Sequence, residues 1–341
     1  MVDIKNLDEA EKVFLHEFEI YNEFSNFIDA NPIEKNEVKD FANSYLNLLN
    51  QAVKLVKISD NTQLKLRNAQ AILKKQNVQI EEQNENLTIA NENQERLLGI
   101  INKELAKAAN YVKSILPKPL KDSSSELKID WKFIPSSKLG GDLFGYKKLD
   151  GHNIALYLLD VCGHGVQSAL YSVSVVNTIN YFNLPNTNFN SPKSVFKSLN
   201  KMFDMKNHNN LFFTMWYGVY NCSTREMVYA SAGHPPAILL KNDGSSELLE
   251  CDNLFIGGLD FEFVEKTCRL DSRDKLFLYS DGAYEIPLNE KDYWTIEELA
   301  TYLSENNDDD NILDKLYQHI NDISFEDSLD DDFSIMRILI K

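Results

Sequence analysis

The sequence predicts an α+β protein whose C-terminal part is a sandwich of β-sheets flanked by helices. An all-α region and a parallel, dimeric coiled coil come before it. Three observations predict this: no glycine occurs before Gly99, apolar residues recur every seven positions from Leu66 to Ile115, and short apolar segments dominate the rest. We divide the chain into a helical regulatory region at 1–59, a coiled coil at 60–116 and the sandwich at 117–341.

The first region carries two stripes of apolar residues at the three- to four-residue spacing of a helix with one buried face. Between them, "NPIE" at 31–34 is typical of a helix start, with Asn31 as the cap and Pro32 in the first turn. Such stripes indicate a core or a dimer interface rather than a cofactor site. The first comprises Phe14, Phe18, Tyr21, Phe24 and Phe27 or Ile28, and the second comprises Val38, Phe41, Tyr45, Leu48, Ala52 and Leu55.

The next region has the seven-residue repeat of a coiled coil, and polar residues within such a repeat fix its register. We expect a homodimer through residues 60–116; the alternative is a single solvated helix. Pro117 and Pro119 forbid the helix from continuing. The main ladder is Leu66, Leu73, Ile80, Leu87, Gln94, Ile101, Ala108 and Ile115, and a weaker one is Ala69, Gln76, Gln83, Ala90 and Leu97.

Composition excludes several classes of function. The net charge is −17 and no long basic stretch occurs, so we expect neither nucleic acid nor an anionic membrane as a partner. The four cysteines are widely spaced, which argues against a zinc site or a disulfide framework and for a reducing compartment. The chain starts with a charged segment and has no apolar run of about 18 residues, so we expect a cytoplasmic protein without a membrane span.

Beyond residue 126, short strands alternate with a few helices, as in a sandwich. Six strands are expected at "NIALYLLDV", "FFTMWYGVYN", "MVYASAG", "AILLK", "KLFLYS" and "FSIMRILI". Helices are expected at "GVQSALYSVSVVNTINYF", "SPKSVFKSLNKMFD" and "TIEELATYLSEN", and an exposed, mobile loop at 306–311.

Four aspartates stand at strand ends, each beside glycine or another acid: Asp142, Asp160, Asp281 and Asp331. Singly, each has a simple interpretation as a turn or cap residue. Together they would repel one another strongly unless a cation neutralised them. Oxygen ligands select hard cations, so we expect two Mn²⁺ or Mg²⁺ ions, which can share a bridging hydroxide and clamp a phosphoryl group during in-line displacement.

The motifs "GGDLFGY", "DVCGHGVQSAL", "SAGHPPAILL", "LYSDGAYE" and "DDFS" resemble, in order, those of the metal-dependent type 2C (PPM) protein phosphatases, and most closely their bacterial SpoIIE-like branch. The resemblance covers about residues 117–341. It implies an αββα sandwich that dephosphorylates phosphoserine or phosphothreonine, typically on a small anti-sigma-factor-antagonist protein. The catalytic metal ligands that it implies are Asp142, Asp160, Asp281 and Asp331, with the Val161 carbonyl as a further ligand. Among Asp330, Asp331 and Asp332, the motif matches Asp331 best and Asp332 second.

The chain departs from the family pattern at two positions: Gly145 stands where a second acid is usual, and Cys162 replaces a serine. His164 either donates a proton to the leaving oxygen or hydrogen-bonds locally, and His234 is expected to hold a turn.

Rival phosphatase chemistries lack their motifs. Ser168 occupies the arginine position of a C-x₅-R motif that would start at Cys162, and no phosphate loop with its lysine occurs. A non-catalytic coiled-coil scaffold that binds a phosphoprotein is the alternative function, and retention of all four aspartates favours the enzyme.

Overall fold

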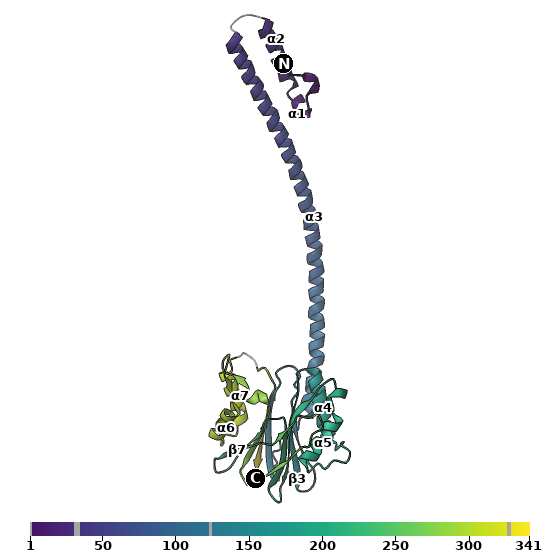
Figure 1. Ribbon diagram of the computed structural model, residues 1–341, viewed down its shortest axis with the longest axis vertical. Coiled ribbons are helices and arrows are strands. Elements are labelled where there is room, and N and C mark those ends of the chain that lie inside the picture. The colour runs from purple at the N-terminus through teal and green to yellow at the C-terminus, as the bar shows by residue number, and fades with distance from the viewer. Residues whose placement is uncertain (1, 31–34, 123–124, 326–328) are drawn as a thin grey trace. The chain divides into compact units, whose positions relative to one another are not determined.

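A computed structural model describes residues 2–30, 35–122, 125–325 and 329–341. The chain forms two compact units, residues 1–98 and residues 99–341, which are described separately (Figure 1). No helix in the described ranges is long and apolar enough to cross a membrane.

The N-terminal unit is a helical hairpin. A 3₁₀ turn η1 (Ile4–Asn6), α1 (Glu9–Lys12) and α2 (Leu15–Ala30) lead to the start of α3 (Lys35–Ile115). Two small apolar clusters join α2 to α3. At the open end of the hairpin, Lys57 of α3 forms ion pairs with Asp8 and Glu11. The clusters are built on the buried residues Phe18, Leu49 and Val53, and on Tyr21, Ile28 and Ala42.

Much of the second stripe is not buried as a core within the single chain, so its other predicted role, a dimer interface, stays untested. Phe41, Leu48 and Leu55 are 68%, 65% and 67% exposed, and Phe24 in the first stripe is 41% exposed. The physical reason is that α2 packs on the neighbouring face of α3, which the smaller Ala42 belongs to. The expected cap at "NPIE" lies outside the described residues.

The long helix ends at Ile115, as the two prolines predict. Ladder residues from Leu66 to Ile101 are exposed in the single chain. The last two ladder residues, Ala108 and Ile115, pack instead against the core of the C-terminal unit beside the buried Val112. The dimer itself stays a prediction.

The C-terminal unit has the predicted αββα architecture. Its first sheet has the order β1-β13-β10-β6-β7, its second the order β2-β3-β4-β5-β8 with β9 paired to β5, and β11 pairs with β12. The strands are β1 (Leu127–Ile134), β2 (Leu143–Lys148), β3 (Asn153–Val161), β4 (Phe213–Asn221), β5 (Glu226–Ala232), β6 (Ala237–Leu240), β7 (Ser246–Leu249), β8 (Asp252–Asn253), β9 (Lys266–Arg269), β10 (Lys275–Tyr279), β11 (Ile286–Pro287), β12 (Tyr293–Trp294) and β13 (Phe333–Ile340).

Helices cover the outer face of each sheet (Figure 1). On one side lie α4 (Val166–Asn180) and α5 (Pro192–Met202), and on the other α6 (Ile296–Glu305) and α7 (Ile312–Ile323). Short 3₁₀ turns occur at η2 (Met205–Asn207) and η3 (Asp281–Ala283).

Alternation along the central strands builds both apolar layers. In β13, Met336 and Ile338 face the core between the sheets, whereas Phe333 and Ile335 face α6 and α7. Both faces are buried, so this strand is a nearly continuous apolar run. The six predicted strands and three predicted helices are therefore confirmed, and α7 is an additional helix.

Hydrogen bonds connect the loop at 306–311 to the sheet, and its mobility stays a prediction. Arg337 of β13 donates to the carbonyls of Asp309 at 3.1 Å and Asp310 at 3.0 Å. It also forms a two-pronged ion pair with Asp130 of β1, with Nε 2.9 Å from the carboxylate. The cluster of charges in this loop is thereby attached to the sheet.

Candidate metal centre

Two of the predicted ligands meet at one end of the β2–β3 hairpin. Asp142 directly precedes β2, and Asp160 is the penultimate residue of β3. The strands are antiparallel with Leu143 opposite Leu159, so continuing this register by one residue sets Asp142 beside Asp160. The β2–β3 hairpin therefore brings together two acids that are too far apart in sequence to belong to one motif.

The other sheet supplies the remaining acids from two adjacent strands. Asp281 follows β10, and Asp331 and Asp332 precede β13. Two serines fasten these strand ends together: Ser280 Oγ donates to the Asp332 carbonyl at 2.9 Å, and the Ser334 N–H donates to Ser280 Oγ at 3.2 Å.

Asp332 links the two sheets. Its carboxylate accepts hydrogen bonds from the Ser136 N–H at 2.8 Å and the Ser136 hydroxyl at 3.1 Å. The other carboxylate oxygen accepts from the Asp142 N–H at 3.3 Å. Asp332 is only 4% exposed. Its carboxylate is thus occupied by protein donors from both sheets, because Ser136 follows β1 of the same sheet and Asp142 precedes β2 of the other.

Asp331 has a different environment. Its side chain is exposed and accepts a hydrogen bond from the Asp332 N–H at 2.8 Å. This contrast favours Asp331 over Asp332 as the ligand.

The acids repel one another in the metal-free fold. Burial, followed by the charges of Asp160 and Asp332, raises the pKa of Asp142 well above its usual range. Burial, followed by Asp281 and Asp331, raises the pKa of Asp160 to about 7. For Asp281, burial and then Asp331 raise the pKa to about 6. Asp281 and Asp331 of one sheet thus act on the pKa of Asp160 in the other, which places the acids of both sheets within electrostatic reach.

The side chains fit a hard divalent cation. Asp142 Oδ2 is buried and has no hydrogen-bond partner among the described atoms, which is costly for an acidic oxygen. Carboxylates are the ligands that Mg²⁺ and Mn²⁺ prefer. Within the described ranges, no three acids, histidines or cysteines already converge in ligand geometry.

Two backbone features support close approach. A Cβ on Gly282 would lie 2.3 Å from the Asp332 carbonyl, so only glycine fits between the ends of β10 and β13. A Cβ on Gly141 would lie 2.9 Å from the Val161 carbonyl oxygen, so this predicted ligand atom points toward the Asp142 segment.

The unusual Gly145 and Cys162 have local explanations. A side chain at Gly145 would approach the Tyr157 hydroxyl to 2.4 Å, so the neighbouring strand leaves no room for an acid. Cys162 Sγ accepts a hydrogen bond from the Phe212 N–H at 3.4 Å, a contact that serine could also make.

Two histidines of the motifs have distinct surroundings. His164 is exposed, and its charge lowers the pKa of Asp331, although burial leaves that pKa above its usual value. His234 is buried, and burial lowers its pKa to about 3, so the ring is neutral. Its Nδ1 lies 2.9 Å from the Thr214 hydroxyl, and its carbonyl accepts from Ser231 at 2.6 Å, which holds a turn as expected.

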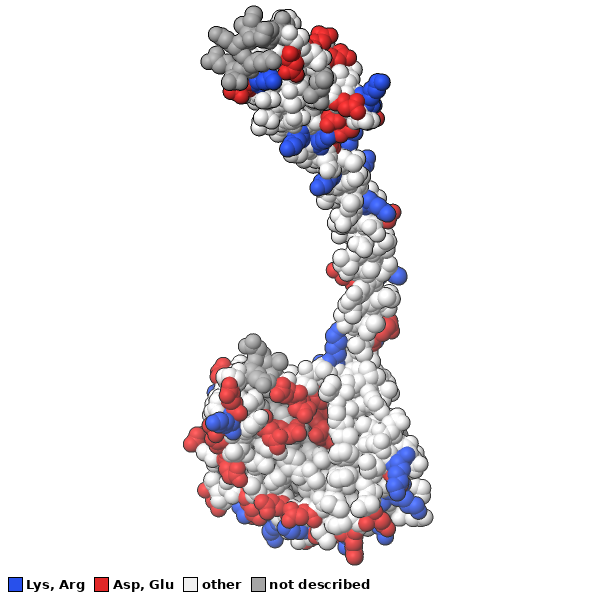
Figure 2. All heavy atoms as spheres, turned by 45° about the horizontal axis from the view of Figure 1, so that its top comes forward, with Lys and Arg blue, Asp and Glu red and all other residues white. Residues whose placement is uncertain are grey.

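A groove of about 180 Å³ adjoins these acids. Asp281 and Asp331 line it together with Glu285 and Tyr293. Figure 2 shows acidic side chains gathered on one face of the C-terminal unit, with no Lys or Arg among them. A phosphate group would need a cation to enter such a groove.

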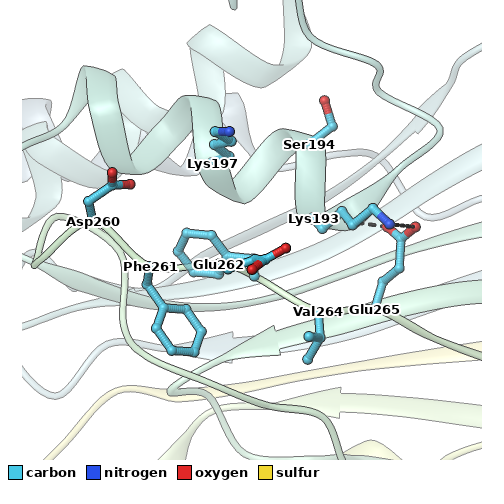
Figure 3. A pocket seen from close by; sticks show the side chains of 9 residues that line it. Lys193, Ser194, Lys197, Asp260, Phe261, Glu262, Val264 and Glu265 are labelled. Atoms are coloured by element: carbon cyan, nitrogen blue, oxygen red, sulfur yellow. Dashed lines mark hydrogen bonds and ion pairs between the residues drawn. The ribbon is translucent and has the colours of Figure 1, made fainter.

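A larger cavity of about 750 Å³ lies elsewhere, between the start of α5 and residues 260–265 (Figure 3). Glu265 already accepts hydrogen bonds there from the Ser191 hydroxyl at 2.8 Å and the Lys193 N–H at 3.1 Å. Its carboxylate also lies 3.4 Å from Lys193 Nζ. Glu265 thus already occupies the groups at the start of α5 that could bind an anion. We therefore do not assign the active site to this cavity.

Sequence reasoning missed the residues that hold the acids in place. Ser280 and Ser334 belong to the same motifs as the predicted ligands, and this closeness in sequence could have indicated a supporting role. Ser136 lies in the loop after β1 and contacts Asp332 because β1 pairs with β13, a pairing of distant segments that no local pattern reveals. Glu285 raises the pKa of Asp281 and lines the groove, and it ends the "SDGAYE" motif.

Comparison with protein families matches residues 150–341 to Stage II sporulation protein E (SpoIIE). The phosphoserine phosphatase RsbP of Bacillus subtilis is 31% identical over 188 residues, which cover 54% of this chain and 45% of RsbP. The phosphoserine phosphatase RsbU of the same organism is 29% identical over 187 residues, 54% of each protein. The chain thus matches about half the length of these relatives.

Solved structures support the fold. The SiaA-PP2C domain of Pseudomonas aeruginosa superposes with a TM-score of 0.61 at 17% identity, covering 71% of this chain and 98% of that one. The phosphatase domain of SpoIIE from Bacillus subtilis, solved with a fragment of its regulatory domain, gives a TM-score of 0.55 at 16% identity and covers 64% of each chain. The αββα sandwich is therefore a PP2C-type fold.

Proposed function

Because the chain belongs to the SpoIIE family, we propose that it is a metal-dependent protein phosphatase that acts on phosphoserine or phosphothreonine. The observation that carries this proposal is the cluster of uncompensated acids from four strand ends. Asp142 and Asp160 belong to one sheet, and Asp281 and Asp331 belong to the other. The names of the relatives RsbP and RsbU support the same chemistry.

Asp142, Asp160, Asp281, Asp331 and the Val161 carbonyl would hold two Mn²⁺ or Mg²⁺ ions. Bound there, the ions would supply an activated water and offset the charge of the phosphate. Asp332 positions the Asp142 backbone, and Ser280 holds the end of β10 against β13. His164 is exposed beside Asp331 and can donate a proton to the leaving serine oxygen.

We further propose a cytoplasmic signalling role. The substrate would be a small phosphorylated regulatory protein of the anti-sigma-factor-antagonist type, and residues 60–116 would form a homodimer that controls activity. The groove beside the acids is small, about 180 Å³, so it suits the phosphorylated side chain of a protein better than a large metabolite. The alternative is a scaffold that binds the phosphoprotein without turnover.

Metal titration tests the proposal. Hydrolysis of a small phosphate ester is measured against Mn²⁺ concentration in the wild type, Asp160→Asn and the control Asp322→Asn, whose side chain is exposed on α7. We expect saturable activation in the wild type and the control, and almost none in Asp160→Asn.

Metal-independent hydrolysis would contradict the two-ion site. A wild type that binds Mn²⁺ and a phosphoprotein but never releases phosphate would favour the scaffold instead.

A further inference from the structure

His234 lies where the chain passes from one sheet to the other. The segment that carries it joins β5 of the second sheet, which ends at Ala232, to β6 of the first sheet, which begins at Ala237. The side chain is 7% exposed, and the Ser231 hydroxyl donates to the His234 carbonyl. This bond holds the turn through the backbone, so the turn itself does not require an imidazole ring.

One ring nitrogen contacts the strand beside Asp160. His234 Nδ1 lies 2.9 Å from the hydroxyl of Thr214 in β4. Thr214 is directly opposite Asp160 in the antiparallel pairing of β3 and β4. Side chains of directly opposed residues lie on the same face of a sheet, with their Cβ atoms about 4.5–5.5 Å apart. The residue that His234 holds is therefore the cross-strand neighbour of a predicted metal ligand.

The ring also faces the strand that leads to Asp281. Burial lowers the pKa of His234 to about 3, and the backbone of Tyr279 opposes this effect, as a nearby carbonyl acceptor does. Tyr279 is the last residue of β10, immediately before Ser280 and Asp281. If the register of β10 and β6 is continued, Tyr279 falls opposite Pro236, which has no backbone N–H to donate.

The second ring nitrogen is the donor available to that carbonyl. His234 Nε2 is buried and has no hydrogen bond of ordinary geometry among the described atoms. A neutral imidazole has one donor and one acceptor nitrogen, and a buried donor without a partner is costly. When the Thr214 hydroxyl donates to Nδ1, the proton is on Nε2 and Tyr279 is the acceptor at hand.

From these contacts we propose that His234 is a positioning residue of the metal centre. Its ring joins β4, next to Asp160, to the end of β10, next to Asp281, and so sets the spacing between acids of the two sheets. The inference rests on the metal site under "Proposed function" and adds to it a residue that touches neither ion nor substrate. Loss of the ring would weaken metal binding more than it weakens the fold.

Direct Mn²⁺ binding by the full-length protein tests the inference, measured from the electron paramagnetic resonance signal of the unbound ion. His234→Asn keeps an amide near the Nδ1 position and His234→Gln keeps one near Nε2, so each retains one contact. The control is Tyr157→Phe, which removes a buried hydrogen bond of 2.8 Å to Asn180. We expect both His234 variants to raise the dissociation constant for Mn²⁺ at least about tenfold, and the control less than about twofold.

A pair of variants at Thr214 separates positioning from packing. Thr214→Val keeps the shape of the side chain and removes the hydroxyl that contacts His234, whereas Thr214→Ser keeps the hydroxyl. We expect weaker Mn²⁺ binding in Thr214→Val and nearly normal binding in Thr214→Ser. If the His234 variants do not fold, as judged by thermal unfolding in a chelator, this pair decides alone.

The remaining outcomes distinguish this inference from the proposed function. If wild type binds Mn²⁺ and the folded His234 and Thr214 variants bind it equally well, His234 only holds a turn and the inference is overturned. Equal weakening in Thr214→Val and Thr214→Ser would also overturn it. If wild type binds no Mn²⁺, the metal site itself fails, and the positioning role fails with it.

Discussion

Two adjacent aspartates, Asp331 and Asp332, show how the surroundings of a side chain can give it a ligand role or a structural role. Asp331 and Asp332 are identical side chains next to each other, yet one is exposed and the other is held by Ser136 and the Asp142 backbone. The sequence predicts that an acid at this strand end binds metal. It cannot choose between neighbours, because the choice depends on a loop donor nearly 200 residues away.

Charge removal at the ligands is the first prediction. Asp160→Asn and Asp281→Asn keep the side-chain shape but remove a charge that a cation requires. We expect each to lower the rate of phosphate hydrolysis by about 100-fold or more, as when a key electrostatic contact is removed. Near-normal rates in both variants would exclude the two-ion site.

The stability of the metal-free protein should fall as pH rises. The pKa values of Asp160 and Asp281 are raised from 3.8 to about 7 and about 6, so the fold favours their protonated forms. Their contribution is fully present below the unfolded pKa and is lost as pH rises through about 7. Thermal unfolding in a chelator should show a smaller loss of Tm between pH 4 and pH 8 in Asp160→Asn than in wild type.

Added Mn²⁺ should restore Tm at pH 8 in the wild type more than in Asp160→Asn, because bound cation replaces the missing proton. An identical pH dependence in the two metal-free proteins would show that the acids do not interact as inferred.

Gly282 sets the spacing between two strand ends. Replacement by alanine would force a Cβ to within 2.3 Å of the Asp332 carbonyl, so β10 and β13 must separate. We expect Gly282→Ala to lower the free energy of unfolding by about 1–3 kcal/mol. Gly151→Ala, where nothing lies within 4 Å of the added atom, is the control for chemical denaturation and should change little.

At the level of elements, periodicity located the strands well because both faces of the central strands are buried. It did not decide which face of α3 packs against α2. Both apolar faces of α3 have helical spacing, and only the position of α2 decides which is internal; Ala42 is too small to mark that face. The last helix, α7, alternates apolar residues with Asp, Lys and Gln over a short span next to an acidic loop, which obscured it.

Arg337 fastens this acidic loop and is the basis of another prediction. The arginine is 5% exposed and joins β13 to β1 and to the loop between α6 and α7. Arg337→Leu would leave Asp130 largely buried without its cation, and we expect a loss of about 3 kcal/mol in unfolding free energy. The exposed pair Arg269–Asp271 provides the control: Arg269→Leu should change stability by less than about 1 kcal/mol. Equal losses in the two variants would refute the anchoring role.

For the whole molecule, the continuity of α3 raises the question of a regulatory lever. One helix runs from Lys35 to Ile115 without a Gly/Ser spacer, and its last turns pack on the core of the C-terminal unit. Gln76, Gln83 and Gln94 weaken the seam, so two helix registers can lie close in energy. The alternative is a tether that serves only to dimerise.

Insertions near Glu92 distinguish lever from tether. Seven added residues preserve the heptad phase, whereas four rotate the downstream helix relative to the upstream part. A lever predicts that the four-residue insertion alone changes phosphatase activity or its response to a signal. If both insertions leave activity equal while the protein stays dimeric in sedimentation, the helix is only a tether.

The hydrogen bond from the Asp142 N–H to the Asp332 carboxylate joins residues that are 190 positions apart in the chain. This separation affects when the site forms during synthesis and folding. Contacts between such distant residues form late, because the intervening loop must first be ordered. During synthesis, a chain that has passed η3 holds Asp142, Asp160 and Asp281 but not β13. Under the proposed function, the capacity to bind cations would therefore arise only when the sandwich closes, and an incomplete chain would be unable to hydrolyse phosphate.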